Sequence, residues 1–483
     1  MALYLGFDVG TQGTKALLID DVQRAVVARA SASYGLIEGL PAGHAEQHPD
    51  TWAAALREVT TRILQQADLK RLAGIGVSGQ QHGAVVLDAA GAVIRPAKLW
   101  CDTSAAEEAE ELSARIGTAI PAGFTAPKLA WMRRHEPELW RKVDLVLLPH
   151  DWVNWKLTGL ATMEPGDASG TGWFDPQARA FSGRALRIVD PRLAGMLPPL
   201  VESGSIAGTL TAEGAAWLGL PRECVGVPVS TGGGDNMMSA IGAGATREGV
   251  AVLSLGTSAT VFAHSSRAVL DPEGLIAPFC DSTGGWLPLL CVMNATGVLE
   301  EVRAAFGTDL EALTREAERV EPGCGGLLFV PYLVGERVPN LPRASASLLG
   351  VRPGLLRPGV VFRAALEGVA LNLALGVERM RGLGLSIDTV RAVGGGARNA
   401  LWRSILADAL EATVVPLSEP ETAALGAALQ AAWTRRRSEG DAIGIDAVAG
   451  GWATPSAAPA RPDAQRVLAL RAARERLARV AGA

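Results

Sequence analysis

The sequence contains one short pattern twice, and this repeat restricts the fold more than any other feature. The segments VGTQGTKALLI (9–19) and LGTSATVFA (255–263) each follow an apolar stretch, and both place Gly-Thr and a second Thr after a hydrophobic residue. Either segment alone could equally be an unrelated β-hairpin, because Gly-Thr turns are common. Together they predict two similar halves, each with a glycine turn whose N–H groups and threonine hydroxyls can meet phosphate oxygens.

The length of the chain agrees with two halves. A chain of 483 residues exceeds one ordinary core, and roughly 200–250 residues in each of two domains is the natural division. The 48% apolar content, 20% charged content and net charge of −5 are typical of a globular protein with a large core. Basic residues are mostly arginine and are scattered, so we expect no nucleic-acid partner.

The cysteines and the N-terminus indicate a reducing compartment. Five widely spaced cysteines without a CxxC pair predict neither a disulfide framework nor a zinc cluster. The start, MALYLGFDVG, lacks a basic segment and carries Asp8 in its apolar run, unlike a signal peptide. No uninterrupted apolar stretch reaches the roughly 18–20 residues that a spanning helix needs. We therefore expect a soluble, cytoplasmic protein with no membrane partner.

The hydrophobic pattern predicts an α/β protein. In the first hundred residues it predicts strands at 3–8, 14–20, 24–32 and 73–78 and a helix at 49–66. A second α/β pattern begins near Gly249, with strands at 389–393 and 412–416 and helices from Asn399 and at 421–433. The Gly-, Ala- and Pro-rich segment 435–460 is typical of a loop, and 463–480 of a closing amphipathic helix.

Asp8 is expected where a buried strand meets a turn. Taken alone, it most simply caps the turn backbone. It could also hold Mg²⁺ through water, beside phosphates that Thr11 and Gln12 would touch. GTQGTK is not a P-loop, because Thr14 interrupts the GxxxxGK[ST] pattern. Phosphate would instead be bound by hairpin turns, as in actin-like and hexokinase-like ATPases.

Asp235 follows three glycines in VPVSTGGGDNMMSAIGAG, between a strand at 227–230 and a helix. One interpretation makes Asp235 an N-cap. The other makes it a base that accepts a hydroxyl proton, with the glycines allowing a substrate to approach the backbone. In both cases we expect the N–H groups and dipole of the helix to keep the carboxylate ionised.

Gln80, Gln81 and His82 follow another buried strand in GIGVSGQQHG. A histidine in such a place is usually structural, but two amides and an imidazole together can read the hydroxyls of a polyol. The remaining histidines lack metal-ligand spacing.

The motifs of this chain resemble those of the FGGY carbohydrate kinases from end to end and occur in the family order. They are GFDVGTQGTK, GQQHG, AGFTAPKLAWMRRHEPELW, PGDASGTGWFD, GGGDN, LSLGTS, FVPYLVGERVP, ALEGVA, GGGARN and ETAALGAAL. The resemblance implies two ribonuclease-H-like domains of the actin/hexokinase ATPase type with a cleft between them. Residues 1–245 would bind sugar, and residues 246–483 would bind ATP.

The resemblance also implies roles for individual residues. Asp235 would be the general base, and Asp8 and Asp235 would lie on the Mg²⁺ side. The sugar would be contacted by Gln81, His82, Trp100, Asp235 and Asn236. The nucleotide would be contacted by Thr11, Gln12, Gly256, Thr257, Gly395, Gly396 and Asn399.

Within the family, GQQHG and GFTAPK look like the xylulokinase branch, which implies a ketopentose, D-xylulose first, as the acceptor of the ATP phosphoryl group. Three positions depart from the common motifs: the stretch 101–104, His48 and Val338. Another ketose, ribulose, polyol or gluconate kinase therefore stays open, as do a silent sugar sensor and an actin- or Hsp70-like ATP-driven protein. A homodimer is also left open.

Overall fold

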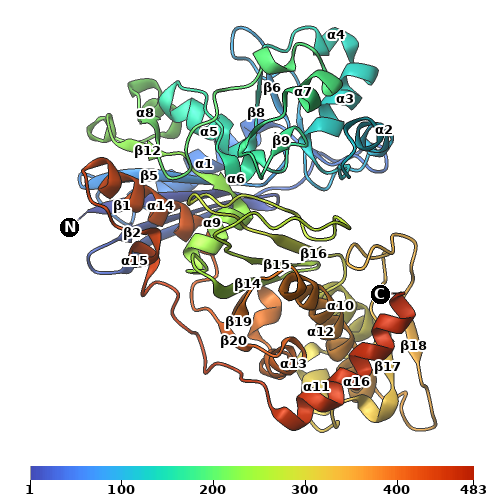
Figure 1. Cartoon of the computed structure of the whole chain (residues 1–483). Coiled ribbons are helices and arrows are strands. Elements are labelled where there is room, and N and C mark those ends of the chain that lie inside the picture. Colours follow the sequence, from blue (N-terminus) through green and yellow to red (C-terminus); the bar gives the residue numbers. More distant parts are fainter. Residues whose placement is uncertain (1, 483) are drawn as a thin grey trace. The chain divides into compact units, whose positions relative to one another are not determined.

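The computed structural model describes residues 2–482, which form two compact units (Figure 1). The first unit runs up to Thr246 and also contains Phe279–Leu287 and Glu421–Trp452. The second contains Arg247–Pro278, Pro288–Pro420 and the chain from Ala453 onward. The expected ranges of 1–245 and 246–483 were continuous, whereas two later segments return to the first unit.

The first unit is built on a seven-stranded mixed sheet with the order β11-β12-β5-β1-β2-β3, and β13 also pairs with β5. Strands β1, β2 and β3 form an antiparallel meander, and β5 runs parallel to β1, as β12 and β13 do to β5. The strands are β1 (Leu3–Val9), β2 (Gly13–Asp20), β3 (Ala25–Ser33), β5 (Leu72–Gly79), β11 (Ile206–Thr209), β12 (Pro228–Ser230) and β13 (Gly233–Gly234).

The second unit repeats this arrangement in a five-stranded sheet with the order β16-β15-β14-β19-β20. Here β14, β15 and β16 form the antiparallel meander, and β19 and β20 add in parallel. The strands are β14 (Gly249–Leu255), β15 (Ala259–Ala263), β16 (Leu289–Val292), β19 (Ile387–Val393) and β20 (Thr413–Pro416). The duplication predicted from the two Gly-Thr hairpins is thus present in the topology, and the α/β class is confirmed.

Helix α1 (Pro49–Leu64) covers one face of the first sheet. Its buried residues, among them Trp52 and Leu56, join Leu5 and Phe7 of β1 in one hydrophobic core. Because side chains alternate along a strand, Gly6 of β1 faces the other way. The alternation explains why apolar residues and a glycine follow one another in this buried strand.

Helix α14 (Thr422–Ser438) packs on the glycine-bearing face of the same sheet. A Cβ at Gly6 would lie 2.0 Å from the carbonyl oxygen of Ala424, and one at Gly76 would lie 1.9 Å from that of Ala427. Only glycine permits this approach of helix backbone to sheet. These contacts explain why a late segment belongs to the first unit.

Helix α9 (Asp235–Gly242) also packs closely against α14. A Cβ at Gly426 would lie 1.8 Å from the carbonyl oxygen of Met238, and a Cβ at Gly242 would lie 1.9 Å from that of Thr422. The helix that begins with Asp235 is therefore held by backbone-to-backbone packing.

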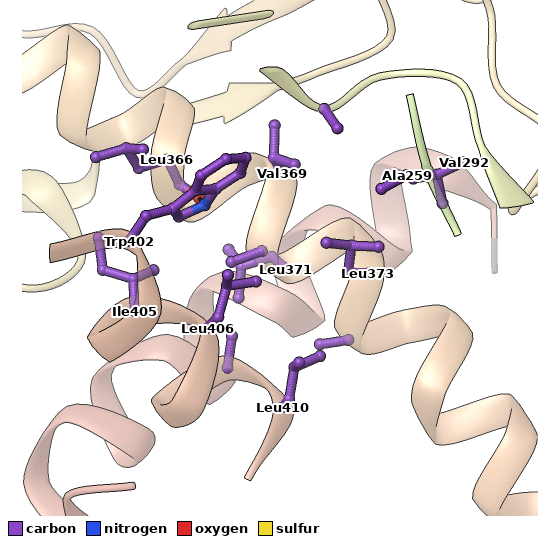
Figure 2. Packing of buried hydrophobic residues seen from close by; sticks show 14 of the residues in the cluster. Ala259, Val292, Leu366, Val369, Leu371, Leu373, Trp402, Ile405, Leu406 and Leu410 are labelled. Atoms are coloured by element: carbon purple, nitrogen blue, oxygen red, sulfur yellow. Dashed lines mark hydrogen bonds between the residues drawn. The ribbon is translucent and has the colours of Figure 1, made fainter. Parts of the chain in front are cut away.

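The core of the second unit lies between helices and sheet (Figure 2). Trp402 of α13 (Ala400–Leu410) is fully buried beside Leu366 of α12 (Pro358–Gly382), and its indole N–H donates to the Leu366 carbonyl at 3.2 Å. By length and composition alone helix α12 could cross a membrane, but 94% of its most apolar 18 residues are buried within the fold. Such burial is what a core helix requires.

The remaining helices of the first unit are α2 (Ala106–Ile116), α3 (Thr125–His135), α4 (Pro137–Trp140), α5 (Pro149–Thr158), α6 (Pro165–Ala168), α7 (Gly183–Val189), α8 (Ala212–Leu218) and α15 (Ile445–Ala449). Those of the second are α10 (Thr296–Phe306), α11 (Leu310–Ala317) and α16 (Ala464–Ala481). Short strands pair as β4 (Glu46–Gln47) with β7 (Ala97–Lys98), β6 (Val85–Leu87) with β8 (Leu145–Leu147), β9 (Phe174–Asp175) with β10 (Ala180–Phe181), and β17 (Leu328–Val330) with β18 (Ser347–Leu349).

The expected loop at 435–460 is wrong in part. Helix α14 continues to Ser438, and α15 forms inside the segment and buries Ile445 and Val448. The indole N–H of Trp433 donates to the carbonyl of Ile443 at 2.9 Å and so folds the segment back onto α14. The local Gly, Ala and Pro content does not reveal this long-range packing.

Candidate active site

Asp8 lies near the end of β1, opposite Lys15 on β2 and Ser78 on β5. Its Oδ1 accepts from the Ser78 hydroxyl at 2.9 Å, and its Oδ2 lies 3.4 Å from the Lys15 ammonium. The charge of Asp8 raises the pKa of Lys15. Asp8 is buried and holds two side-chain partners, so it does more than cap a turn, the simpler interpretation of the sequence.

Asp235 is brought to the same edge of the sheet as Asp8. Gly233 and Gly234 pair with Ser78 and Gly79 of β5, and Asp8 pairs with Ser78 from the other side. The carboxyl ends of these parallel strands therefore place both acids within a few strand spacings of about 4.8 Å. Asp235 is the first residue of α9, whose N-cap is Gly234, so the N-cap interpretation does not hold.

The expectation that the helix N-terminus keeps Asp235 ionised is wrong. Burial, followed by the charges of Asp8 and Asp167, raises the pKa of Asp235 to about 7. The backbone N–H of Asn236, which donates to Oδ1 at 2.9 Å, acts in the opposite direction and lowers this pKa. Desolvation and two like charges outweigh the helix terminus here. The carboxyl group can thus take up a proton near neutral pH.

Gln81 and Asn236 form a polar pair beside Asp235. The Asn236 side-chain amide donates to Gln81 Oε1 at 2.8 Å and to Asp235 Oδ1 at 3.2 Å. The Gln81 Nε2 is buried and has no hydrogen-bond partner among residues 2–482. A Cβ at Gly234 would lie 2.6 Å from Gln81, so the triple glycine makes room for this amide. An open buried donor of this kind fits a ligand hydroxyl.

Thr11 and Trp100 are joined by a hydrogen-bond chain. The half-exposed Trp100 indole N–H donates to the Thr11 hydroxyl at 2.9 Å, which donates to Gln80 Oε1 at 2.8 Å. Gln80 in turn donates to Gln47 Oε1 at 3.0 Å. The Thr11 side chain is thus engaged with a residue predicted to face sugar, while Gln12 beside it is exposed. Gln47 was not singled out from the sequence, although it completes this series of hydrogen bonds.

In the second unit the two predicted nucleotide segments lie together. Gly256 and Thr257 form the tip of the β14–β15 hairpin, and Thr296 at the start of α10 donates its hydroxyl to the Gly256 carbonyl at 2.8 Å. A Cβ at Gly396 would meet both Leu255 and Thr296 within 3.1 Å, whereas one at Gly395 would meet nothing within 4 Å. Gly395 therefore leaves open space beside the hairpin.

Asn399 has a structural task next to this turn. Its Oδ1 accepts from the backbone N–H of Trp402 at 3.0 Å as the N-cap of α13, and its Nδ2 donates to the Thr314 hydroxyl at 3.0 Å. Both ends of the amide are engaged, so Asn399 fixes the position of the glycine turn.

Among residues 2–482, one cluster of three side chains has ligand atoms close enough together to hold a metal ion. His44, Glu46 and Asp102 place ligand atoms within 4.8 Å of one another. The Lys98 ammonium lies 3.1 Å from Glu46, 3.2 Å from His44 and 3.3 Å from Asp102, so a built-in cation already serves this group. Asp8 and Asp235 are the carboxylates that the family resemblance implies for Mg²⁺, and the repulsion by Asp8 that raises the pKa of Asp235 is what a hydrated divalent cation with oxygen ligands would relieve.

The unusual stretch 101–104 has a structural explanation at one position. Asp102 is buried and accepts from the backbone N–H groups of Ala45 at 2.9 Å and Ser104 at 3.0 Å. It therefore anchors the loop that carries Trp100.

The sequence did not single out Gln430 of α14. Gln430 accepts from the Gly232 N–H at 2.9 Å and donates to the carbonyls of Gly232 at 3.1 Å and Ser282 at 3.0 Å. It thus ties the glycine turn before Asp235 to two late segments. No local signal marks such a residue, since its partners lie far away in the chain.

The model of the FGGY family of carbohydrate kinases, N-terminal domain, matches residues 3–242, and that of the C-terminal domain matches residues 251–435. The duplicated mixed sheets are also the two-domain fold of a solved xylulose kinase from Rhodospirillum rubrum. This chain belongs to the FGGY family of carbohydrate kinases, whose sugar kinases use ATP. The resemblance and the fold expected from it are confirmed, and the chain is an enzyme.

Several known proteins are similar to this one. The xylulose kinase of Haemophilus influenzae is 39% identical over 455 residues, which cover 90% of this chain and 92% of that protein. The structure of a xylulose kinase from Rhodospirillum rubrum has a TM-score of 0.88 at 28% identity and covers 99% of this chain and 98% of its own. A gluconate kinase from Lactobacillus acidophilus, at 21% identity, reaches a TM-score of 0.90 over 100% and 98%. The fold alone therefore does not specify the sugar.

Proposed function

We propose that this enzyme transfers the γ-phosphoryl group of MgATP to the terminal hydroxyl of D-xylulose and so forms D-xylulose 5-phosphate. The observation that carries the proposal is the buried Gln81 Nε2, which has no hydrogen-bond partner among residues 2–482 and lies beside Asp235. The raised pKa of Asp235 suits proton transfer. The similarity to xylulose kinases supports the choice of sugar. A cytoplasmic location and a homodimer stay predictions.

Asp235 is the general base of the proposed reaction. It accepts the proton of the terminal hydroxyl as that oxygen forms its bond to phosphorus, and a pKa near the working pH is best for this task. Asp8, with Asp235, would hold Mg²⁺ through water, and the ion would neutralise charge on the phosphates. Lys15 keeps a positive charge next to Asp8.

Sugar recognition would rest on polar groups that the protein leaves open. A buried donor without a partner costs about 1–3 kcal/mol, and a hydroxyl at the right position removes that cost. Gln81 Nε2 is such a donor, and His82 and Trp100 lie on the adjoining loops. A sugar whose hydroxyl is misplaced would leave Gln81 unpaired, so we expect discrimination between epimers.

We propose nucleotide contacts in each unit, taken by itself. In the second unit, Gly256 and Thr257 would meet phosphate, and Gly395 and Gly396 would lie by the adenosine. In the first unit, Thr11 and Gln12 would contact phosphate, Thr11 through its backbone because its hydroxyl is engaged. Asn399 would act by holding the glycine turn in place.

We expect D-xylulose to be the preferred acceptor. ADP release by the purified protein, measured with D-xylulose, L-ribulose, glycerol and gluconate, should give a kcat/KM for D-xylulose at least about tenfold above the others, the lower bound for one unpaired buried group. The Asp235→Asn variant supplies the background of sugar-independent ATP hydrolysis. A different preferred sugar would contradict the substrate assignment, and no transfer to any of these acceptors would contradict the proposed reaction.

The rate should depend on pH through Asp235. Only the deprotonated carboxylate accepts a proton, so kcat/KM should fall tenfold per pH unit below about 7 and level off above it. The profile is measured with both substrates below saturation, where kcat/KM reports the enzyme before MgATP binds, and free Mg²⁺ is kept low because a bound cation would favour the carboxylate and lower the inflection. Burial also raises the pKa of Asp151 to about 7, so Asp151→Asn is the control and should keep the inflection. If the inflection is lost in Asp151→Asn, it arises from Asp151, and its assignment to Asp235 is contradicted.

A further inference from the structure

Lys128 is a fully buried lysine that the proposed reaction does not use. It lies on α3, in the GFTAPK segment, and is 1% exposed. Its ammonium donates to the carbonyl of His82 at 2.7 Å and to that of Gly123 at 2.6 Å. Burial lowers the pKa of Lys128 to about 7. Burial of an amine lowers the stability of the fold unless the amine is hydrogen-bonded. The two carbonyls that accept from Lys128 therefore show which part of the protein it holds.

The first of these acceptors belongs to a strained residue. His82 has a φ of 66°, in the left-handed region that residues other than glycine rarely adopt. Such a conformation persists only where the surroundings hold it, and it is found most often at functional sites. The Thr125 hydroxyl donates to the same His82 carbonyl at 3.3 Å, so the start of α3 holds this carbonyl with two side chains.

The imidazole of His82 is confined as closely as its backbone. Its ring centre lies 4.9 Å from that of Phe124 and 5.8 Å from that of Phe279. On a third side, a Cβ at Gly170 would lie 1.8 Å from the imidazole Cε1. With the left-handed turn at His82, the ring lies between the two phenyl rings and Gly170. A change in the backbone at His82 would move the imidazole, and Lys128 holds the carbonyl of that residue.

We propose that Lys128 is a positioning residue for sugar recognition, which holds the left-handed turn at His82 and thereby aims the imidazole at the sugar. This inference rests on the proposed function, because it takes His82 as a sugar contact. Lys128 itself touches no substrate. Removing its amine should leave the His82 carbonyl short of a donor and let the turn relax to an ordinary backbone conformation.

The test compares Lys128→Met, which keeps the length of the side chain without its donor, with Lys142→Met, which removes an exposed lysine of the same unit. We expect Lys128→Met to raise the KM for D-xylulose at least about tenfold, with the KM for ATP unchanged within about twofold. Lys142→Met should match the wild type. Gly170→Ala, which pushes directly on the imidazole, should produce the same sugar-specific defect.

Histidine NMR gives a second readout that needs no activity. Two phenyl rings shift the His82 Cε1–H resonance, so in Lys128→Met it should move toward the position of a free histidine. The His150 resonance should stay in place, because its Nδ1 is held by Asp167 at 2.7 Å in a separate contact. The unchanged His150 signal would show that the fold is intact. This measurement stays valid even if D-xylulose is not the substrate.

Normal sugar KM and an unmoved His82 resonance in folded Lys128→Met would overturn the inference. If that variant does not fold, Thr125→Val decides, since it removes the second donor to the same carbonyl. A smaller rise in sugar KM with a moved His82 signal supports the inference, and no change in either measurement contradicts it. Equal defects for sugar and ATP in a folded variant would also contradict it.

Discussion

Replacement of Asp235 by asparagine should abolish phosphoryl transfer while sugar and ATP still bind. The amide keeps the shape of the carboxyl group but cannot accept the hydroxyl proton, and loss of a general base lowers rates by roughly 10²–10⁴-fold. Single-turnover transfer and equilibrium binding of each substrate are the measurements. Asp151→Asn is the matched control, because Asp151 is also a buried acid but is not the proposed base. Near-normal turnover in Asp235→Asn would exclude the base assignment.

The same variant should be more stable than the wild type at pH 8. The fold raises the pKa of Asp235 from 3.8 to about 7, so the folded state loses stability relative to the unfolded chain as the pH rises from about 4 to about 7, and the full loss persists above pH 7. Asparagine removes the repulsion by Asp8 and Asp167. We expect a rise in Tm of a few degrees at pH 8, where roughly 2–4 °C corresponds to 1 kcal/mol, and little difference near pH 4. A lower Tm at pH 8 would contradict the repulsion.

Replacement of Gly76 by alanine should severely destabilise the first unit. The new Cβ would lie 1.9 Å from the backbone oxygen of Ala427, which no side-chain rotation can relieve. Helix α14 would have to move off the sheet, so we expect a loss of more than about 3 kcal/mol, beyond the usual 1–3 kcal/mol of overpacking. Urea unfolding followed by tryptophan fluorescence measures the effect.

Gly35→Ala is the control for the Gly76 variant. A Cβ at Gly35 would meet nothing within 4 Å, and Gly35 is exposed, so its change should stay within about 0.5 kcal/mol. Wild-type stability in Gly76→Ala would contradict the close packing of α14 on β5. The result tests directly whether a segment after residue 420 belongs to the first unit.

Local sequence patterns were sufficient to predict the two sheets. Alternating and continuous apolar runs mark strands, and glycine turns mark hairpins, because both depend on nearby residues. The predicted helix at 49–66 lies at Pro49–Leu64, and the two Gly-Thr hairpins do lie in equivalent positions. Asp8 and Asp235 could also be selected from the sequence as candidate site residues, because polar residues that follow parallel strands meet at one edge of a sheet.

Other features of the site depend on residues far apart in the chain. The sequence-based boundary missed that α14 returns to the first unit, which follows from glycines on β1 and β5 that meet its backbone. The ionisation of Asp235 was mispredicted from its place on a helix, because burial and neighbouring charges decide it. Lys128 and Gln430 were not assigned roles, because their acceptors lie on other elements. The sequence alone determined the duplicated α/β halves and the main acidic residues. Only the tertiary structure decided their environment, because desolvation and packing arise between distant segments.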